Sequence, residues 1–308
     1  MIAKDNQLLI LDGRAMLDAC WHVAKSSPNY NEATDLFMVG LRRAINFIRP
    51  SHVLAAFDHP AGSSWRKRIC PEYKANRPQK DARHIEQIEL AIKCCRALGI
   101  HTVYSQHGEA DDVIATAVSR LPPEMDALIY TRDKDLYQLL SRPLTGAIWR
   151  DSKVGAWQEV RGASAVREKV GVYAAQIADL LAIAGDAADN IKGCPGVGEV
   201  TAKALLAKYA NLSEIFNNLA FLGVRGADSV ASMLRAGRAQ ITNAFVLVSL
   251  RKDITDEAIP TAEAIEQALR WSWASANLQE FVQGGLPGTD FVRWQLDNLE
   301  PPTEDKIM

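Results

Sequence analysis

Cysteine is scarce in this chain, and the few that occur are scattered. The five cysteines are odd in number and never spaced as CxxC, so the sequence supports neither a disulfide framework nor a zinc site. No apolar run approaches the roughly 18 residues that a bilayer-spanning helix needs. The N-terminus also lacks the apolar core of a signal peptide, because Asp5 and Asp12 bracket only a short apolar run. We therefore expect a reduced cytoplasmic protein without a membrane segment.

An excess of either charge is also lacking. The 35 Lys and Arg against 37 Asp and Glu leave a net charge of −2, which excludes a globally basic nucleic-acid binder. Any contact with phosphate must then come from a local patch. Apolar residues make up 48% and charged residues 23% of the 308, which excludes a disordered or fibrous chain and favours about two domains. The six histidines show no metal-ligand spacing.

The pattern of apolar residues changes midway along the chain. The first half alternates short apolar runs with helical stretches such as 35–49 and 85–98, and we predict strands at Leu8–Leu11, Val53–Phe57, His101–Tyr104 and Ala127–Tyr130. This alternation predicts an α/β domain with a mainly parallel central sheet and flanking helices. After Trp149 strand patterns become scarce and the apolar runs have helical spacing, as in 174–183, 202–209 and 244–250. We expect an α/β domain over residues 1–165 and a helical domain over 166–308.

Acidic residues recur where predicted strands end and helices begin. Three apolar runs end in an aspartate, and the carboxyl ends of parallel strands meet at one edge of a sheet. Further acids lie in the segments GEADDVIATAV, TRDKDL and AGDAADNIKG, which gives the set Asp12, Asp58, Glu109, Asp111, Asp112, Asp133, Asp135, Asp186 and Asp189. A single such residue is usually a turn or cap residue, but nine together need another explanation. If the turn at AGDAADN is helical, its two aspartates share a helix face.

Crowded carboxylates repel one another unless cations neutralise them. An all-oxygen set without His or Cys suits Mg²⁺ or Mn²⁺ better than zinc or copper. Two such ions about 4 Å apart would activate a water and stabilise the leaving oxygen of an in-line phosphoryl displacement. We therefore predict that the nine carboxylates bind two Mg²⁺ ions, for which Mn²⁺ can substitute.

A basic segment follows Asp58. It reads RKRICPEYKANRPQKDAR over residues 66–83, with seven Lys or Arg, two acidic residues, and two prolines that interrupt any helix. By itself it is typical of a solvated charged loop, but beside a carboxylate site it suits a polyanionic substrate. We predict that Lys74 and Arg77 contact the scissile phosphate. Stacking on a base and ordinary packing are equally open for Tyr73. The predicted DNA contacts in this segment are Arg66, Lys67, Arg68, Tyr73 and Lys80.

A glycine-rich turn follows the last acidic segment. The sequence IKGCPGVGEVTAKALLAKYA predicts a helix, a tight turn and a second helix. Gly196 and Gly198 allow the backbone to approach a phosphate, and the N–H groups that open the second helix favour an anion. Lys192 and Lys203 add positive charge. Alone this motif fits an ordinary helix connection equally well, but its place after Asp186 and Asp189 favours a backbone clamp on DNA.

Taken together, these segments resemble the 5′-nuclease family, which comprises the 5′→3′ exonuclease domain of bacterial DNA polymerase I, phage 5′ nucleases and flap endonucleases. The matching stretches occur in family order over roughly residues 7–210: LLILDGRAML, AAFDHPAGSSWRKRICPEYKANRP, GEADDVIATAV, TRDKDLYQLL and GDAADNIKGCPGVGEVTAKALL. The resemblance implies a PIN-like metallonuclease core with a helical arch at about 63–90. It also implies a helix–two-turn–helix motif at about 180–210 that grips duplex DNA, often with a K⁺ held by backbone carbonyls.

The resemblance maps the nine carboxylates onto metal-site positions, Lys74 onto the arch lysine and Arg77 onto its neighbour. It implies a free-standing, monomeric nuclease in a bacterial or phage-infected cell, acting on DNA with 5′ ends, nicks or 5′ flaps. Two positions depart from the family. Ala19 stands where a basic residue is common, with Arg14 as the candidate replacement, and Arg132 stands where a small residue is usual.

Three functions are weighed for this chain. The first is a structure-specific 5′ nuclease, an exonuclease or flap endonuclease that hydrolyses DNA phosphodiesters with two metal ions. The second is a DNA-binding module of the same fold without catalysis, which the complete carboxylate set disfavours. The third is a haloacid-dehalogenase-type phosphatase, whose chemistry needs a second carboxylate two residues after the first. Arg14 stands at that position, which disfavours this function. Packing is favoured over base stacking for the C-terminal tryptophans Trp271, Trp273 and Trp294.

Overall fold

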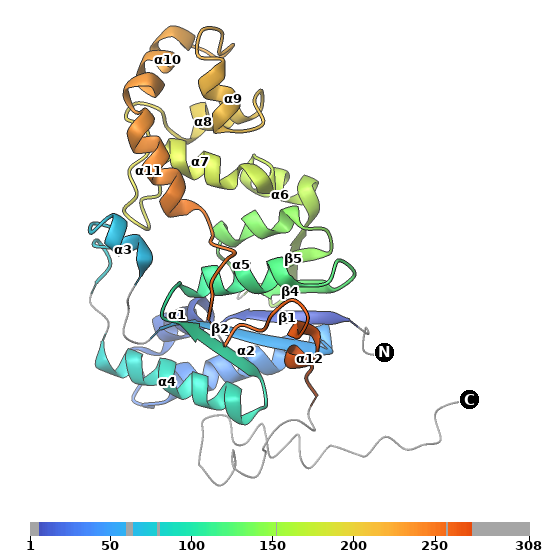
Figure 1. The fold of residues 1–308 in the computed structure, drawn as a ribbon. Helices are drawn as coiled ribbons and strands as arrows, with labels where there is room; N and C mark the ends of the chain where they lie inside the picture. The colour runs from blue at the N-terminus through green and yellow to red at the C-terminus, as the bar shows by residue number, and fades with distance from the viewer. Residues whose placement is uncertain (1–5, 60–63, 79–80, 152, 257, 273–308) are drawn as a thin grey trace.

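A six-stranded sheet forms the centre of the structure. The computed structural model describes residues 6–59, 64–78, 81–151, 153–256 and 258–272 (Figure 1). Its strand order is β3-β2-β1-β4-β5-β6, in which only β6 runs antiparallel to its neighbour. The strands are β1 (Gln7–Asp12), β2 (His52–Asp58), β3 (His101–Ser105), β4 (Asp126–Tyr130), β5 (Thr145–Arg150) and β6 (Trp157–Arg161). The mainly parallel α/β fold predicted from the sequence is confirmed.

Strands β5 and β6 were not predicted. β6 is an edge strand in which only Val160 is buried, so it carries no apolar run that a sequence pattern could detect. β5 is almost fully buried, but its short sequence TGAIWR mixes small, polar and aromatic residues. The four predicted strands are β1 to β4. The apolar runs of β1, β2 and β4 reflect helices packed on both faces of the sheet, whereas β3 is an edge strand that is only partly buried.

Alternate residues of the central strands serve two separate cores. Leu9 and Leu11 of β1 pack with α1 (Gly13–Ala24), α2 (Glu32–Ile48) and α4 (Ala82–Ala97) on one face of the sheet. Leu8 and Ile10 pack on the other face with α5 (Ala110–Arg120) and α12 (Ile265–Leu269). Because side chains of a strand alternate between its faces, this arrangement makes three layers with both sheet faces covered.

The second half is helical, as predicted. It contains α6 (Gly162–Val170), η2 (Ala174–Gln176), α7 (Ile177–Ala184), α8 (Glu199–Leu206), α9 (Leu212–Asn217), α10 (Ala227–Ala236) and α11 (Arg238–Val248). Figure 1 shows α7 to α11 as a helical group at one end of the sheet layers. Their apolar faces share one core with η1 (Asp135–Ser141) and with residues of β5 and β6. No helix among the described residues is long and apolar enough to cross a membrane.

The chain returns to the α/β layers after α11. Ile254, Ile259 and Leu269 are buried in the core of β1 and α5. Trp271 is also buried, and its Nε1 donates to the Leu98 carbonyl at 2.9 Å. Its predicted packing role is therefore confirmed, although it packs on the α/β layers and not on a helical face. Trp273 and Trp294 lie outside the described residues, and the predicted domain boundary at 165/166 stays a prediction.

The segment predicted as an arch at about 63–90 includes the first half of α4, and the arch itself stays a prediction. Residues 82–90 belong to α4, which packs beside α2, and the Thr34 hydroxyl of α2 donates to Gln87 Oε1 at 2.7 Å. The short helix α3 (Trp65–Ile69) stands away from the sheet in Figure 1, and a series of turns follows it over residues 71–75. Pro71 and Pro78 prevent a longer helix there, as the sequence predicts.

Candidate active site

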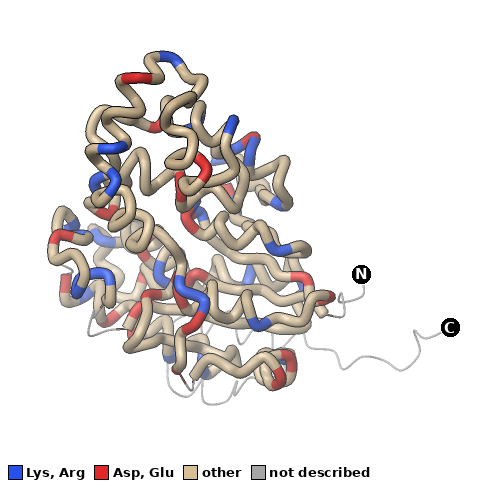
Figure 2. The backbone as a smooth tube through the Cα atoms, turned by 45° about the horizontal axis from the view of Figure 1, so that its top comes forward, with Lys and Arg blue, Asp and Glu red and all other residues tan. Residues whose placement is uncertain are grey.

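Eight of the nine predicted metal ligands line one cleft at the carboxyl edge of the sheet. The cleft has a volume of about 740 Å³, and the predicted ligands that line it are Asp12, Asp58, Glu109, Asp111, Asp133, Asp135, Asp186 and Asp189, with Asp18 and Glu199 as further acidic residues. They come from the ends of β1 and β2, the first turn of α5, the loop after β4 and the loop after α7. Figure 2 shows that Lys and Arg positions and Asp and Glu positions are interspersed along the backbone.

Backbone hydrogen bonds orient the strand-end aspartates. Oδ1 of Asp12 accepts from the Ala15 amide at 3.0 Å and caps α1, while Oδ2 accepts from the Thr131 hydroxyl at 2.8 Å. Oδ1 of Asp58 accepts from the Ala110 amide at 3.0 Å, at the start of α5. Asp12 thus does serve as a cap, which is the common role of a strand-end aspartate, whereas Asp58 binds an amide of a helix that Glu109 caps. Both aspartates also line the cleft.

The carboxylates in the middle of the cleft are poorly compensated. Burial, together with neighbouring carboxylates such as Asp133, raises the pKa of Asp12 to about 7 and the pKa of Asp135 to about 8. Burial and the same repulsion also raise the pKa of Asp111. At the rim the balance is reversed, because Lys74 and Arg66 outweigh the effect of burial and lower the pKa of Glu109 to about 2.

The donor chemistry of the cleft fits divalent cations that prefer oxygen ligands. Carboxylates that raise one another's pKa gain stability from a positive charge placed among them, and Mg²⁺ and Mn²⁺ prefer such ligands. Within the described part of the chain, no three Asp, Glu, His or Cys side chains are grouped tightly enough to hold one ion. Glu109 and Asp189 pair instead with the cations of the basic segment.

The two predicted phosphate contacts lie at the rim of this cleft. Lys74 Nζ is 2.8 Å from Glu109 Oε2 and 3.6 Å from Asp189 Oδ2, and Arg77 pairs with Asp189. The Lys74 backbone has a φ of 55°, in the left-handed region that residues other than glycine seldom adopt. Its amide donates to the Asp189 carbonyl at 2.9 Å. The fold thus holds Lys74 in a strained conformation over the carboxylates.

Tyr73 packs and does not stack on a base. It is 2% exposed, and its hydroxyl lies 2.9 Å from both Glu109 Oε2 and Asp189 Oδ2. The stacking interpretation, and with it the predicted DNA contact of Tyr73, is wrong because neither face of the ring is available. The side chain instead joins the basic segment to two acidic loops.

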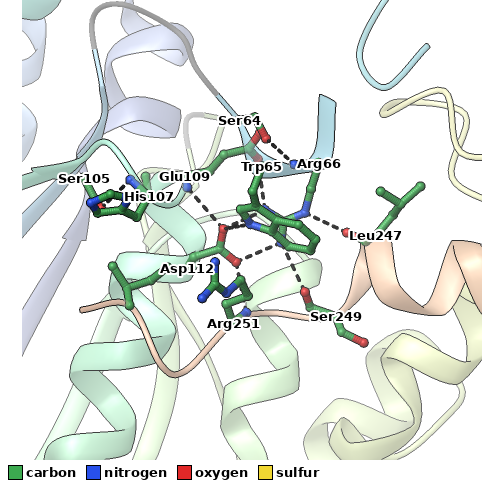
Figure 3. A network of polar contacts seen from close by, with 12 residues as sticks. Ser64, Trp65, Arg66, Ser105, His107, Glu109, Asp112, Leu247, Ser249 and Arg251 are labelled. Atoms are coloured by element: carbon green, nitrogen blue, oxygen red, sulfur yellow. Dashed lines mark hydrogen bonds and ion pairs between the residues drawn. The ribbon is translucent and has the colours of Figure 1, made fainter. Parts of the chain in front are cut away.

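Asp112 faces away from the cleft. It is fully buried, and its oxygens accept from Arg66 at 2.7 and 2.8 Å, from Trp65 Nε1 at 3.0 Å and from the Arg251 amide at 3.0 Å (Figure 3). The prediction that Asp112 binds metal is therefore wrong, since its side chain does not line the cleft and its charge is paired with the buried Arg66 guanidinium. The predicted DNA contact of Arg66 is wrong for the same reason, because it is 3% exposed.

The remaining predicted DNA contacts lie on two surfaces. Lys67 and Arg68 of α3 are exposed, and Lys80 lies outside the described residues. In the glycine-rich loop Lys192, Gly196 and Gly198 are exposed. Lys203 pairs with Glu199 one helical turn away, with 2.6 Å between Nζ and Oε1.

The acidic loop before this turn is not helical. Helix α7 ends at Ala184, and Asp186 pairs with Ile191 in an isolated antiparallel bridge. Asp186 and Asp189 therefore share a tight loop and not a helix face, and helical structure resumes only at Glu199. The predicted helix–turn–helix arrangement holds in outline, with α7 and α8 as the two helices.

Gly185 and Gly193 close the base of this loop by direct backbone contact. A Cβ on Gly193 would lie 2.2 Å from the Gly185 nitrogen, a distance that no rotamer change can relieve. We expect Gly193→Ala to lower stability by about 1–3 kcal/mol, as overpacking does, and to displace Asp186 and Asp189. Thermal unfolding tests the loss of stability, with Gly198→Ala as the control because a Cβ there meets nothing within 4 Å. DNA cleavage by Gly193→Ala is compared with the wild type alone, because Gly198 is itself a predicted DNA contact. Equal melting temperatures for the two variants would contradict it.

The place of some residues in the cleft could be predicted from the sequence only weakly or not at all. Thr131 orients Asp12, and it could have been noticed only as a polar residue at the end of β4. Arg14 lines the cleft and pairs with Asp18 one turn along α1, with 2.8 Å between Nε and Oδ2. Ala19 and Arg132, the two departures from the family, also line the cleft.

Comparison with protein families divides the chain into two adjoining matches. Residues 7–171 match the model described as the 5′-3′ exonuclease N-terminal resolvase-like domain. Residues 172–269 match the 5′-3′ exonuclease C-terminal SAM fold.

Relatives of known function cover most of the chain. The 5′-3′ exonuclease of Mycoplasmopsis pulmonis is 28% identical over 82% of this chain and 83% of the relative. Flap endonuclease Xni of Shewanella oneidensis is 29% identical over 81% of this chain and 91% of its own length. DNA polymerase I of Mycobacterium tuberculosis is 38% identical over 68% of this chain, which spans 23% of that larger protein.

A solved structure supports the same fold. T5 5′-exonuclease with bound divalent zinc ions superposes with a TM-score of 0.64 and 19% identity, covering 94% of this chain and 98% of the other. At this identity the likeness concerns the fold alone. The two family matches together extend from residue 7 to residue 269, and residues of both line the carboxylate cleft. The chain belongs to the 5′-3′ exonuclease family, whose members include flap endonucleases.

Proposed function

We propose that this protein cuts DNA at 5′ ends, nicks or 5′ flaps in a reaction that depends on Mg²⁺. The observation that carries the proposal is the single cleft in which eight carboxylates face Lys74 and Arg77. Negative side chains alone would repel a phosphodiester, and positive side chains alone would bind it without activating water. Both kinds of group at one edge of the sheet fit hydrolysis of a polyanion.

The eight carboxylates that line the cleft would hold two Mg²⁺ ions, or Mn²⁺ in their place. The chemistry that such a pair supplies is activation of water for in-line attack and stabilisation of the leaving oxygen. Asp12 and Asp58 are held by amide and hydroxyl donors, so their oxygens keep a fixed direction toward the cleft. Such preorganised ligands favour one geometry at the reacting phosphate.

Lys74 and Arg77 would bind the scissile phosphate from the rim. Both pair with Asp189 in the structure, and Lys74 also with Glu109. A phosphate oxygen would replace these carboxylates as the partner of the two cations. Because the left-handed backbone at Lys74 is tied to Asp189, the Nζ group stays near the cleft during this exchange.

The duplex would be held at the glycine-rich loop. Gly196, Gly198 and Lys192 are exposed there, and the first amides of α8 are free to face a phosphate. Lys203 contributes after release from Glu199, and Lys67 and Arg68 supply charge along α3. A K⁺ at this loop, a monomeric state and a cytoplasmic location are further parts of the proposal.

Removal of divalent ions tests the proposed chemistry. We expect cleavage of a 5′-flap substrate in Mg²⁺ or Mn²⁺ and a loss of at least about 100-fold in EDTA, while DNA binding persists. Matched single-stranded, nicked and 5′-flap DNA, with products sized from the labelled end, would show which substrate is cut. Binding without cleavage under every condition would instead support a DNA-binding module.

A further inference from the structure

The buried pair of Arg66 and Asp112 joins three parts of the molecule that are distant in sequence. Arg66 belongs to α3, and Asp112 lies in the first turn of α5 (Figure 3). Arg66 Nε also donates to the Leu247 carbonyl at 2.7 Å, and its Nη2 donates to the Ser249 carbonyl at 3.2 Å. One guanidinium therefore holds α3, α5 and the C-terminal end of α11 together.

The α5 side of this junction belongs to the cleft. Oδ2 of Asp112 accepts from the Glu109 amide at 3.1 Å, so the same carboxylate that binds Arg66 also sets the backbone that carries Glu109. Asp111 is its sequence neighbour and lines the cleft. Glu109 in turn holds Lys74. A displacement of Asp112 would therefore move a cleft carboxylate and the cation at the rim.

The α11 side of the junction leads to the glycine-rich loop. Near its N-terminus, α11 contacts this loop through Gln240, whose Nε2 donates to the Gly193 carbonyl. Gly237, which precedes the helix, lies against Cys194. Helix α11 has 11 residues and is about 16 Å long at about 1.5 Å per residue. It therefore links the predicted duplex grip at one end to Arg66 at the other.

From this arrangement we propose that Arg66 and Asp112 are positioning residues that set where the strand is cut. They fix the carboxylate cleft at a constant distance from the loop at residues 193–198. The phosphate that reaches the cleft then lies a constant number of nucleotides from the point where the duplex is held. This inference rests on the proposed nuclease function and adds to it the determinant of the cleavage position.

Two conservative substitutions loosen the junction without leaving a large cavity. Arg66→Lys keeps the charge but cannot hold Asp112 and the α11 carbonyls together, because an ammonium lacks the planar fork of donors. Asp112→Asn keeps the shape and removes the charge. Successive phosphates of one strand are spaced about 3.4 Å along the duplex axis, so a displacement of that size along the axis shifts the cut by a nucleotide. We expect roughly half of the main product to move to neighbouring positions.

The assay is product mapping at single-nucleotide resolution on one 5′-flap substrate with the full-length protein. Arg120→Lys is the matched control, because Arg120 also holds backbone carbonyls of the C-terminal segment, at Ile254, Ile259 and Pro260, but from the far end of α5. This control should cut where the wild type cuts. Unchanged positions in both Arg66→Lys and Asp112→Asn would overturn the proposal.

A metal titration separates positioning from ligation. If Asp112 acts through the junction with Arg66 and not as a ligand, Asp112→Asn and Arg66→Lys need the same concentration of Mn²⁺ for half-maximal cleavage. A clear rise in that concentration for Asp112→Asn alone would make Asp112 a metal ligand after all and overturn the positioning role. A uniform loss of rate with an unchanged product pattern would indicate a structural role only and would also overturn it.

Gln240→Ala acts at the opposite end of α11. It tests whether this connection sets the cleavage position if the junction variants do not fold. It removes the contact with Gly193 and leaves the buried pair intact. A spread of cut positions in this variant supports the proposal, and a single unchanged position overturns it. Failure of the wild type to cut any substrate would overturn the proposed function itself, whereas wild-type cleavage with unchanged variants overturns only the positioning role.

Discussion

Asp133→Asn should reduce the rate of DNA cleavage by roughly 100-fold or more while leaving DNA affinity within about threefold, since metal ligation contributes several kcal/mol to the transition state. Asp133 follows β4, and its Oδ1 accepts from the Asp135 amide at 2.9 Å. Asparagine keeps that acceptor, so the turn is preserved and only the charge is lost. Single-turnover cleavage in Mg²⁺ and DNA binding in EDTA measure the two effects.

The control for this variant lies on the same strand. Asp126 begins β4 at the opposite edge of the sheet, where it pairs with Arg161 at 3.0 Å. Asp126→Asn removes the same charge outside the cleft and should leave the cleavage rate within about twofold, because exposed ion pairs contribute little. Equal losses of cleavage and DNA binding in Asp133→Asn would argue against direct ligation by Asp133.

Lys74→Gln should also reduce cleavage by about 100-fold, as the loss of one group that stabilises transition-state charge commonly does. Asp133→Asn removes a proposed metal ligand and should weaken Mn²⁺ binding, whereas Lys74→Gln should not. Lys74 lies among carboxylates and competes with divalent cations for Glu109, so its removal should not weaken Mn²⁺ binding. Cleavage rates at saturating Mn²⁺, together with a Mn²⁺ titration of the protein alone, test both expectations.

The matched control for Lys74 is Lys93, which is exposed on α4. Lys93→Gln changes the net charge equally and should leave both measurements as in the wild type. If Lys74→Gln retained full cleavage, the phosphate would have to be held by Arg77 or by groups outside the basic segment. A similar loss in Lys93→Gln would show that net charge, and not the position of Lys74, determines the rate.

The elements that could be predicted from the sequence are those with strong local patterns. β1, β2 and β4 lie inside the sheet, so each appears as an apolar run, and the aspartate that ends β1 or β2 marks the carboxyl edge of the sheet. β6 lies at the edge and is mostly exposed, so its composition resembles that of a loop. The loop of Asp186 and Asp189 depends on two glycines packed backbone to backbone, and their residue types alone do not reveal that they meet.

The sequence by itself determined the fold class and the gathering of carboxylates, because strand positions and strand ends follow from patterns within each segment and the carboxyl ends of parallel strands meet at one edge of the sheet. Only the tertiary structure decided between Asp111 and Asp112. The two are adjacent and chemically identical, but Arg66 of α3 pairs with Asp112, whereas Asp111 lines the cleft. The tertiary structure also decided between packing and base stacking for Tyr73, because Glu109 and Asp189 from two acidic loops both bind its hydroxyl. Contacts between distant segments select the partner of each charged group, and a local pattern carries no information about that choice.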